Sequence, residues 1–239
     1  LSTDIHPNKN PHIDAPFGYG EVLGTGRIDT NLLVTSYKNY LLWRGHFLAE
    51  TFDYDALDVE NPHVVYKSQK ARQIVFADGF GMKKNPIFNY LPMQGSKGEY
   101  LFIEAPDLNE KSAIKSSVFV IPEGDNIYRV GANYERNDKS GRPTEQAKKE
   151  LLKKLESLIR CDYNVVDQVA GVRPTVSDRR PLVGRHPKFQ NVYILNGFGS
   201  RGVMTGPYAS GQLYRHIEAN IPLDPEMDIA RFAAKHFTA

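Results

Sequence analysis

The chain has 239 residues, which is long enough to bury a sizeable core in one large domain or two small ones. Hydrophobic residues make up 41% and charged residues 24% of it, as in an ordinary soluble globular protein, and we expect no membrane span because no apolar run reaches about eighteen residues. Lys and Arg number 30 against 28 Asp and Glu, a net charge of +2 that gives no reason to expect a nucleic-acid partner.

The cysteine and histidine content argues against a disulfide-stabilised protein and against a zinc protein. The single cysteine, Cys161, cannot form an internal disulfide and indicates a reducing compartment, so we expect a cytoplasmic protein. The seven histidines are scattered along the chain, and none falls in a Cys/His spacing typical of zinc. We therefore expect no metal site.

The first part of the chain predicts an extended lead-in, a short strand and a helix. Residues 1–16 contain three prolines and no hydrophobic periodicity, which indicates an extended segment. Glycines on both sides of Glu21-Val22-Leu23 predict a short strand between turns. Asp29 and Thr30 can cap a helix whose apolar residues recur every three or four positions, and Gly45 is expected to end it.

The middle of the chain is rich in predicted strands. We expect them at 47–52, 58–66, 73–77, 100–103, 117–121 and 127–131, and the turn between the last two predicts a β-hairpin. Thr144 and Glu145 begin an amphipathic helix with an inner stripe of four leucines and Ile159, and a strand at 165–170 follows it. This order predicts an α+β fold with a large mixed, mostly antiparallel sheet.

A glycine-rich turn in the last quarter of the chain is the clearest candidate binding feature. An apolar strand at 192–195 leads into the turn 196–202, and a helix is predicted from about 203 to 217. This arrangement directs free backbone N–H groups and the positive end of a helix toward an electron-rich ligand. The letters Gly197-x-Gly199-x-x-Gly202 also match the dinucleotide fingerprint, but no βαβ unit follows them, which disfavours pyrophosphate binding here.

Three segments carry a family resemblance: Gly171-Val172-Arg173-Pro174, Pro181-Leu182-Val183-Gly184 and the turn 196–202, with further matches at 76–79, 97–99 and 131–135. They resemble the FAD-dependent amine oxidoreductases of the D-amino-acid oxidase superfamily, especially glycine oxidase and D-amino-acid dehydrogenase. The resemblance covers roughly residues 17–217. It implies a non-covalent FAD cofactor and a small amino-acid or amine substrate.

The resemblance also implies a division of the chain. Residues 17–82 and 171–217 are expected to be pieces of an incomplete FAD-binding domain, 83–170 a substrate-binding domain and 218–239 a C-terminal tail. Members of the family begin with a βαβ unit whose glycine-rich loop holds the FAD pyrophosphate, and no segment here matches it. We therefore expect this chain to resemble only the back part of such an enzyme. Either the polypeptide is truncated, or the front half is a separate chain, or the family's chemistry has been lost. FAD is expected to be held weakly, or to be absent, when this chain is alone.

The family's cofactor contacts map onto three places in the sequence. They are the strand end after 77, the start of the segment 171–174, and the turn with the first residues of the following helix. A helix N-terminus beside the flavin ring would stabilise the negative charge that develops there, although the same glycines could simply make a turn. The candidate cofactor residues are Asp78, Gly79, Gly171, Val172, Gly197, Phe198, Gly199, Ser200, Gly202, Val203 and Met204.

Two arginines are the candidate catalytic residues. Arg173 offers two parallel N–H donors that match a substrate carboxylate, and the alternative is an ion pair with an acid such as Asp178. Arg201 could face the substrate, contact the flavin or pair with an acid at the surface. Tyr100, Tyr128 and Tyr134 could line the pocket, with core packing as the default.

A second hypothesis comes from another class of protein. The chain could be a binding or assembly subunit that keeps the fold without redox chemistry. The two arginines and the glycine turn favour the oxidoreductase hypothesis, whereas the missing FAD fingerprint favours the second. Cys161 lies far from the turn in sequence, so a covalent flavin link is not expected.

Overall fold

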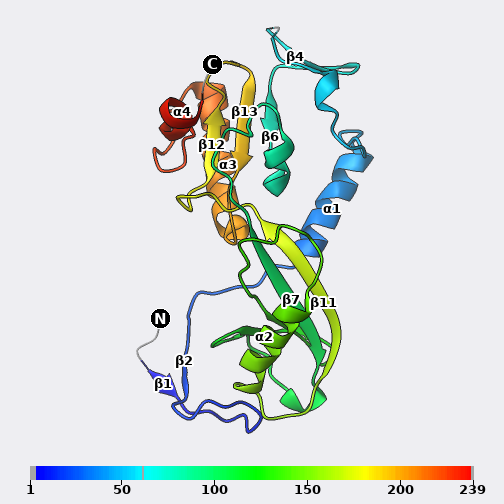
Figure 1. Ribbon diagram of the computed structural model, residues 1–239, viewed down its shortest axis with the longest axis vertical. Helices are drawn as coiled ribbons and strands as arrows, with labels where there is room; N and C mark the ends of the chain where they lie inside the picture. Colours follow the sequence, from blue (N-terminus) through cyan, green and yellow to red (C-terminus); the bar gives the residue numbers. More distant parts are fainter. Residues whose placement is uncertain (1–3, 61, 238–239) are drawn as a thin grey trace.

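The computed structural model describes residues 4–60 and 62–237 and shows an elongated molecule (Figure 1). Two long antiparallel strands, β7 (Ser96–Glu104) and β11 (Asn164–Arg173), extend between a lower body and an upper body. The upper body contains β6 (Ile74–Phe76), β12 (Leu182–Arg185), β13 (Val192–Asn196) and α3 (Gly202–Ala219). The elements include antiparallel sheets and a few helices, so the predicted α+β fold class is confirmed. No helix among the described residues is long and apolar enough to cross a membrane.

The lower body is built on an antiparallel five-stranded sheet in the order β11-β7-β10-β9-β8. Strands β9 (Phe119–Gly124) and β10 (Ile127–Gly131) form the predicted hairpin, and β8 (Ile114–Lys115) pairs with β9 at the edge. The hairpin turn holds Asp125 and Asn126 at φ values of 48° and 61°, the left-handed conformation that a tight two-residue turn requires.

Helix α2 (Glu145–Glu156) covers one face of this sheet and completes the main core of the lower body. Its N-cap Thr144 accepts a hydrogen bond from the backbone N–H of Ala147, as the sequence predicts. Its buried leucines pack with strand residues of β7, β9 and β10 and with Ile13. In the N-terminal segment, β1 (Ile5–His6) pairs with β2 (Tyr19–Gly20). The observed strand ends before residue 21, so the strand predicted at 21–23 is wrong in its position.

The upper body holds a small mixed sheet. Strand β13 (Val192–Asn196) lies between β12 (Leu182–Arg185), which is antiparallel to it, and β6 (Ile74–Phe76), which is parallel. Beside the sheet lie α3 (Gly202–Ala219), α4 (Ala230–His236) and the 3-10 helix η2 (Gly79–Lys84). After α3 the described chain forms α4 and one isolated bridge, between Asp228 and Val183, but no further strand, so no βαβ unit follows the glycine turn in the described residues.

The strand predicted at 47–52 is absent, and the one predicted at 58–66 is split. The observed strands there are β3 (Leu57–Asp58), β4 (Val64–Tyr66) and β5 (Gln69–Ala71). Two further 3-10 helices are η1 (Tyr54–Ala56) and η3 (Pro106–Leu108). Phe52 stacks on Tyr66 at 4.4 Å between ring centroids and meets Phe76 edge-on. Aromatic packing thus fixes this segment in place of a hydrogen-bonded ladder.

Helix α1 (Thr30–Trp43) forms where the sequence predicts it, with Asp29 as its N-cap. Its apolar face, however, is uncovered, because none of its residues is buried. Leu32, Tyr37 and Trp43 are 64%, 60% and 79% exposed. An amphipathic helix normally buries that stripe, so α1 presents an apolar surface without a partner among the described residues.

A buried ion cluster joins β7 to the loop before α2. The side chain of Lys97 is fully buried, with its Nζ 2.6 Å from Asp138 Oδ2 and 3.2 Å from Glu99 Oε1. Glu99 in turn accepts hydrogen bonds from the N–H and the hydroxyl of Thr144 and from the amide of Gln168. The cluster therefore fixes the loop 132–143 against the sheet.

The pKa directions follow from these contacts. Burial by itself would lower the pKa of Lys97, but Asp138 and Glu99 outweigh burial and raise it above its ordinary value. Burial would raise the pKa of Glu99, but the hydrogen bonds from Thr144, Gln168 and Lys97 outweigh it and lower the pKa. Both groups are thus charged in the folded protein at neutral pH.

We predict that Lys97→Met lowers the free energy of unfolding by about 3 kcal/mol, because it leaves a buried carboxylate without its cation. Chemical denaturation at pH 7 measures this change, with the exposed Lys111→Met as the control. The pKa of Glu99 is lowered by folding, so the cluster's contribution is present above the ordinary carboxyl pKa of 4.5 and is lost as the pH falls below it. The difference between wild type and variant should therefore shrink in acid, and a constant difference would contradict the prediction.

Candidate functional site

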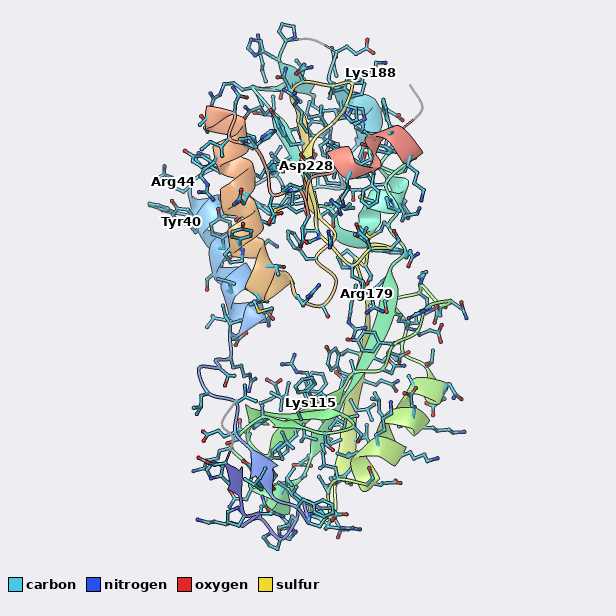
Figure 2. All side chains as sticks on the ribbon, turned by 90° about the vertical axis from the view of Figure 1, so that its left-hand side faces the viewer. Tyr40, Arg44, Lys115, Arg179, Lys188 and Asp228 are labelled. Carbon is cyan, nitrogen blue, oxygen red and sulfur yellow. The ribbon has the colours of Figure 1, made fainter. Side chains whose placement is uncertain are left out.

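A pocket of about 880 Å³ lies where the two bodies meet. Its wall is built from the residues that lead into β7, from the loop after β10, from the end of β11 and its following turn, and from the turn before α3. Arg179, one of the lining residues, lies at the junction of the bodies in Figure 2. The pocket brings together Arg173 and the glycine turn 197–201, which the sequence analysis singled out separately.

The position of Arg173 follows from the pairing of β11 with β7. In this register Arg173 lies opposite Ser96, and Gly171 lies opposite Gly98. The Arg173 side chain crosses diagonally over Gly98, since a Cβ built on Gly98 would come within 1.9 Å of the guanidinium. Glycine at this position is therefore what lets the arginine lie against the strand.

The guanidinium of Arg173 has no acidic partner among the described residues. Its Nη1 donates to the carbonyl of Asn133 at 3.4 Å, and its central carbon lies 4.5 Å from the ring centroid of Tyr134. The alternative of an ion pair with Asp178 is wrong, because Asp178 pairs at 2.9 Å with Arg231 of α4. Arg173 thus keeps its donors available at the pocket wall.

Arg201 is the N-cap residue of α3, and its Nη2 donates to the carbonyl of Arg179 at 3.1 Å. No ion pair with a surface acid is found for it in the described parts of the chain. The helix start has no side-chain capping bond and no acidic residue in its first turn. Its first N–H groups are therefore left to solvent or to a ligand.

The glycines of the turn have different roles. Gly197 has φ of 76°, and a Cβ on it would lie 2.7 Å from Val176, so this glycine is required by close packing. Gly199 has φ of 56°, and its nearest neighbour would be the hydroxyl of Thr175 at 3.9 Å. The backbone at Gly199 is thus open toward the pocket.

The remaining candidate cofactor residues do not line the pocket. Asp78 and Gly79 lie on the other side of the turn, where the Asn196 amide donates to Asp78 Oδ1 at 3.0 Å and to the Gly79 carbonyl at 2.9 Å. Gly171 and Val172 lie in β11, two residues and one residue before Arg173. Gly202 is in the first turn of α3 and is half-buried, and Val203 and Met204 beside it are exposed.

Several lining residues carry no signal in the sequence. Arg136 and Lys139 follow a strand in a polar loop, and Arg179 stands in a turn, where charged residues are common. Tyr134, for which core packing was the default, is 68% exposed and lines the pocket, whereas Tyr128 is buried in the core as that default predicts. Only the β7–β11 pairing places these segments around one cavity.

Other chemistries find no support in the structure. No group of three His, Cys, Asp or Glu side chains among the described residues could hold a metal ion. Cys161 packs against the core of the lower body, and burial raises the pKa of its thiol, which makes it a poor nucleophile. It does not line the pocket.

Comparisons with known proteins give a consistent result. The family model described as "FAD dependent oxidoreductase" matches residues 5–215. The glycine oxidase of Bacillus subtilis is 26% identical over 226 residues, which cover 86% of this chain and 59% of that protein. The Aromatoleum aromaticum protein named "tRNA 5-methylaminomethyl-2-thiouridine biosynthesis bifunctional protein MnmC" is 26% identical over 175 residues, covering 64% of this chain and 28% of that protein. The chain thus spans less than two thirds of these relatives.

Solved structures share the fold. Iminodiacetate oxidase from Chelativorans sp. BNC1 superposes with a TM-score of 0.68 at 23% identity, over 84% of this chain and 58% of that one. Glycine oxidase from Geobacillus kaustophilus gives a TM-score of 0.61 at 19% identity, over 80% of this chain and 52% of that one. At these sequence identities the similarity shows that the chains share an arrangement of helices and strands, and it shows nothing about activity.

We predict that Asn196→Ala lowers the free energy of unfolding by about 1–3 kcal/mol, because it removes the buried amide that joins the turns at 78–79 and 196–197. The Asn196 side chain also accepts from the N–H of Gly197 at 2.8 Å, so both turns lose a partner. Thermal and chemical denaturation measure the loss, and Asn137→Ala, at an exposed position, is the control. Equal stability of the two variants would show that the turns are held by other contacts.

Proposed function

This chain belongs to the family of FAD-dependent oxidoreductases, and we propose that it is the substrate-binding, C-terminal part of an enzyme that oxidises an amino acid or a primary or secondary amine. The observation that carries the proposal is the pocket itself. It joins an arginine without an acidic partner, Arg173, to an open turn at the start of a helix, 199–201. A carboxylate-bearing amine held by the first would face a flavin held by the second.

The residues at the start of α3 fit the flavin end of FAD. The backbone at Gly199 has no side chain in front of it, and the first turn of α3 has free N–H groups and no acid. When bound, FAD supplies the ring that accepts a hydride from the substrate α-carbon. The N–H groups and dipole of α3 would stabilise negative charge at that end of the ring. In our proposal Asp78 and Asn196 hold the turns at 78–79 and 196–197 together. Gly171 and Val172 are the strand residues that position Arg173.

Arg173 would bind the carboxylate of the substrate. A guanidinium offers two parallel N–H donors to a carboxylate, and the ring of Tyr134 supports the arginine from below at 4.5 Å. This contact would fix the orientation of the amine relative to the flavin. Arg201, at the opposite side of the turn, would add positive charge near the same end of the site.

We further propose that the FAD pyrophosphate is held by a part of the protein that covers α1. The apolar face of α1 is exposed along its length, and large exposed apolar patches mark contact surfaces. The chain also spans 59% of the glycine oxidase that it matches, which leaves a substantial part of that relative unmatched. In this proposal the described residues hold only the flavin ring of FAD, and the part of the protein that covers α1 holds the pyrophosphate.

Two alternatives are separated by simple measurements. Protein purified from its source should be yellow, with flavin absorbance, if it is an oxidoreductase. A colourless protein that takes up no added FAD would instead be the non-catalytic binding subunit. The relative named for tRNA thiouridine biosynthesis suggests a second substrate class, an amine carried on tRNA. If this class is correct, tRNA should reduce the flavin and free amino acids should not.

We predict that Arg173→Lys raises the KM for carboxylate substrates about 50-fold, because lysine cannot make the paired hydrogen bonds of a guanidinium. The flavin content should stay nearly unchanged, since Arg173 holds the substrate and not the cofactor. Steady-state kinetics with the flavin-containing protein measure this, and Arg180→Lys, outside the pocket, is the control. An unaltered KM in the Arg173 variant would remove Arg173 from the substrate site.

The paired glycines of β7 and β11 give a second prediction. Gly98→Ala should displace the Arg173 guanidinium and raise the KM for carboxylate substrates about tenfold, because the new methyl group occupies its place. Gly171→Ala is the matched control, since a Cβ there meets no atom within 4 Å although the two glycines are cross-strand partners. Equal effects of the two substitutions would mean that the glycines serve the strand backbone and not the arginine.

A further inference from the structure

The wall of the pocket gathers positive charge. Five of its lining residues are cationic and none is acidic; the cations are Arg136, Lys139, Arg173, Arg179 and Arg201. In the whole chain 30 Lys and Arg are nearly balanced by 28 Asp and Glu, whereas the lining of this pocket has cations without acids. A concave wall of one sign raises the local concentration of ligands of the opposite sign.

The acids that adjoin these cations in sequence are turned to other partners. Asp138, between Arg136 and Lys139, is held 2.6 Å from the buried Lys97. Asp178, next to Arg179, is held by the guanidinium of an arginine in α4 at 2.9 Å. Glu135 accepts from a backbone N–H two residues further on, at 2.5 Å. None of these three acids lines the pocket, and none of them forms an ion pair with the five cations.

The contacts of the cations themselves are to neutral groups. Arg173, Lys139 and Arg201 donate to backbone carbonyls at 3.4, 3.0 and 3.1 Å. None of the five forms an ion pair within residues 4–60 and 62–237. Like charges around one cavity repel each other, and an anionic ligand relieves that repulsion. Its electrostatic binding energy is therefore larger here than at a surface where acids already neutralise the cations.

We propose that the substrate is an amine bearing two carboxylates, an amino or imino dicarboxylic acid. This rests on the proposed function, in which Arg173 binds the carboxylate nearest the oxidised carbon. One carboxylate neutralises one guanidinium, so the other cations select for a second acidic group on the same molecule. Arg136 and Lys139, which share the loop that also carries Tyr134, would bind that second carboxylate.

Binding of simple probes tests the proposal without turnover. Succinate and butyrate have the same number of carbon atoms and differ in the second carboxylate, and isothermal titration of the purified protein measures both. Succinate should bind about tenfold more tightly at low salt, and its advantage should fall as the salt concentration rises. The variant Arg136→Gln/Lys139→Gln should lose most of that advantage, whereas Lys111→Gln/Lys149→Gln, which removes two lysines that do not line the pocket, should keep it.

Equal binding of the two acids, or an advantage that survives in the pocket variant, would overturn the proposal. So would tighter binding of inorganic pyrophosphate than of succinate, because the pocket would then be a phosphate site. In the flavin-containing protein, oxidation of iminodiacetate in preference to sarcosine is expected, since both are secondary amines and only the first has two carboxylates. A succinate advantage in protein that binds no flavin would overturn the proposed function while leaving the anion site intact.

Discussion

The antiparallel pairing of β7 with β11 is the constraint on which the site depends. Its register places Arg173 beside the entrance to β7 and sets a glycine beneath the guanidinium. The same two strands join the lower body to the upper one, as Figure 1 shows. A shift of the register by one residue would turn Arg173 to the opposite face of the sheet and separate it from the glycine turn.

The buried Lys97 links stability to the charge of the pocket. It is enclosed by the fold and takes Asp138 as its partner, which anchors the loop carrying Arg136 and Lys139. The same contact pairs Asp138, which lies between those two cations in the sequence, with Lys97. An interaction of the lower body therefore also affects the charge balance of the neighbouring loop, which lines the pocket.

The upper body contributes backbone in place of reactive side chains. Asn196 holds the two strand-end turns together, and Gly197 allows the chain to turn tightly against Val176. This leaves Gly199 and the turn up to Arg201, the N-cap of α3, at the wall of the cavity. In our proposal a flavin ring approaches the main chain closely at this surface. The apolar face of α1 is uncovered among the described residues.

The sequence by itself determined the features that depend on neighbours along the chain. The capped helix α2 with its leucine stripe, the β9–β10 hairpin and the strand, turn and helix around Gly199 all follow from local spacing and turn chemistry. Only the tertiary structure decided that segment 47–52 is held by aromatic stacking, that Asp178 pairs with Arg231, and that five cations share one wall. The reason is physical: these outcomes depend on contacts between residues far apart in the chain, and no local pattern encodes which distant partner a charge or a ring will meet.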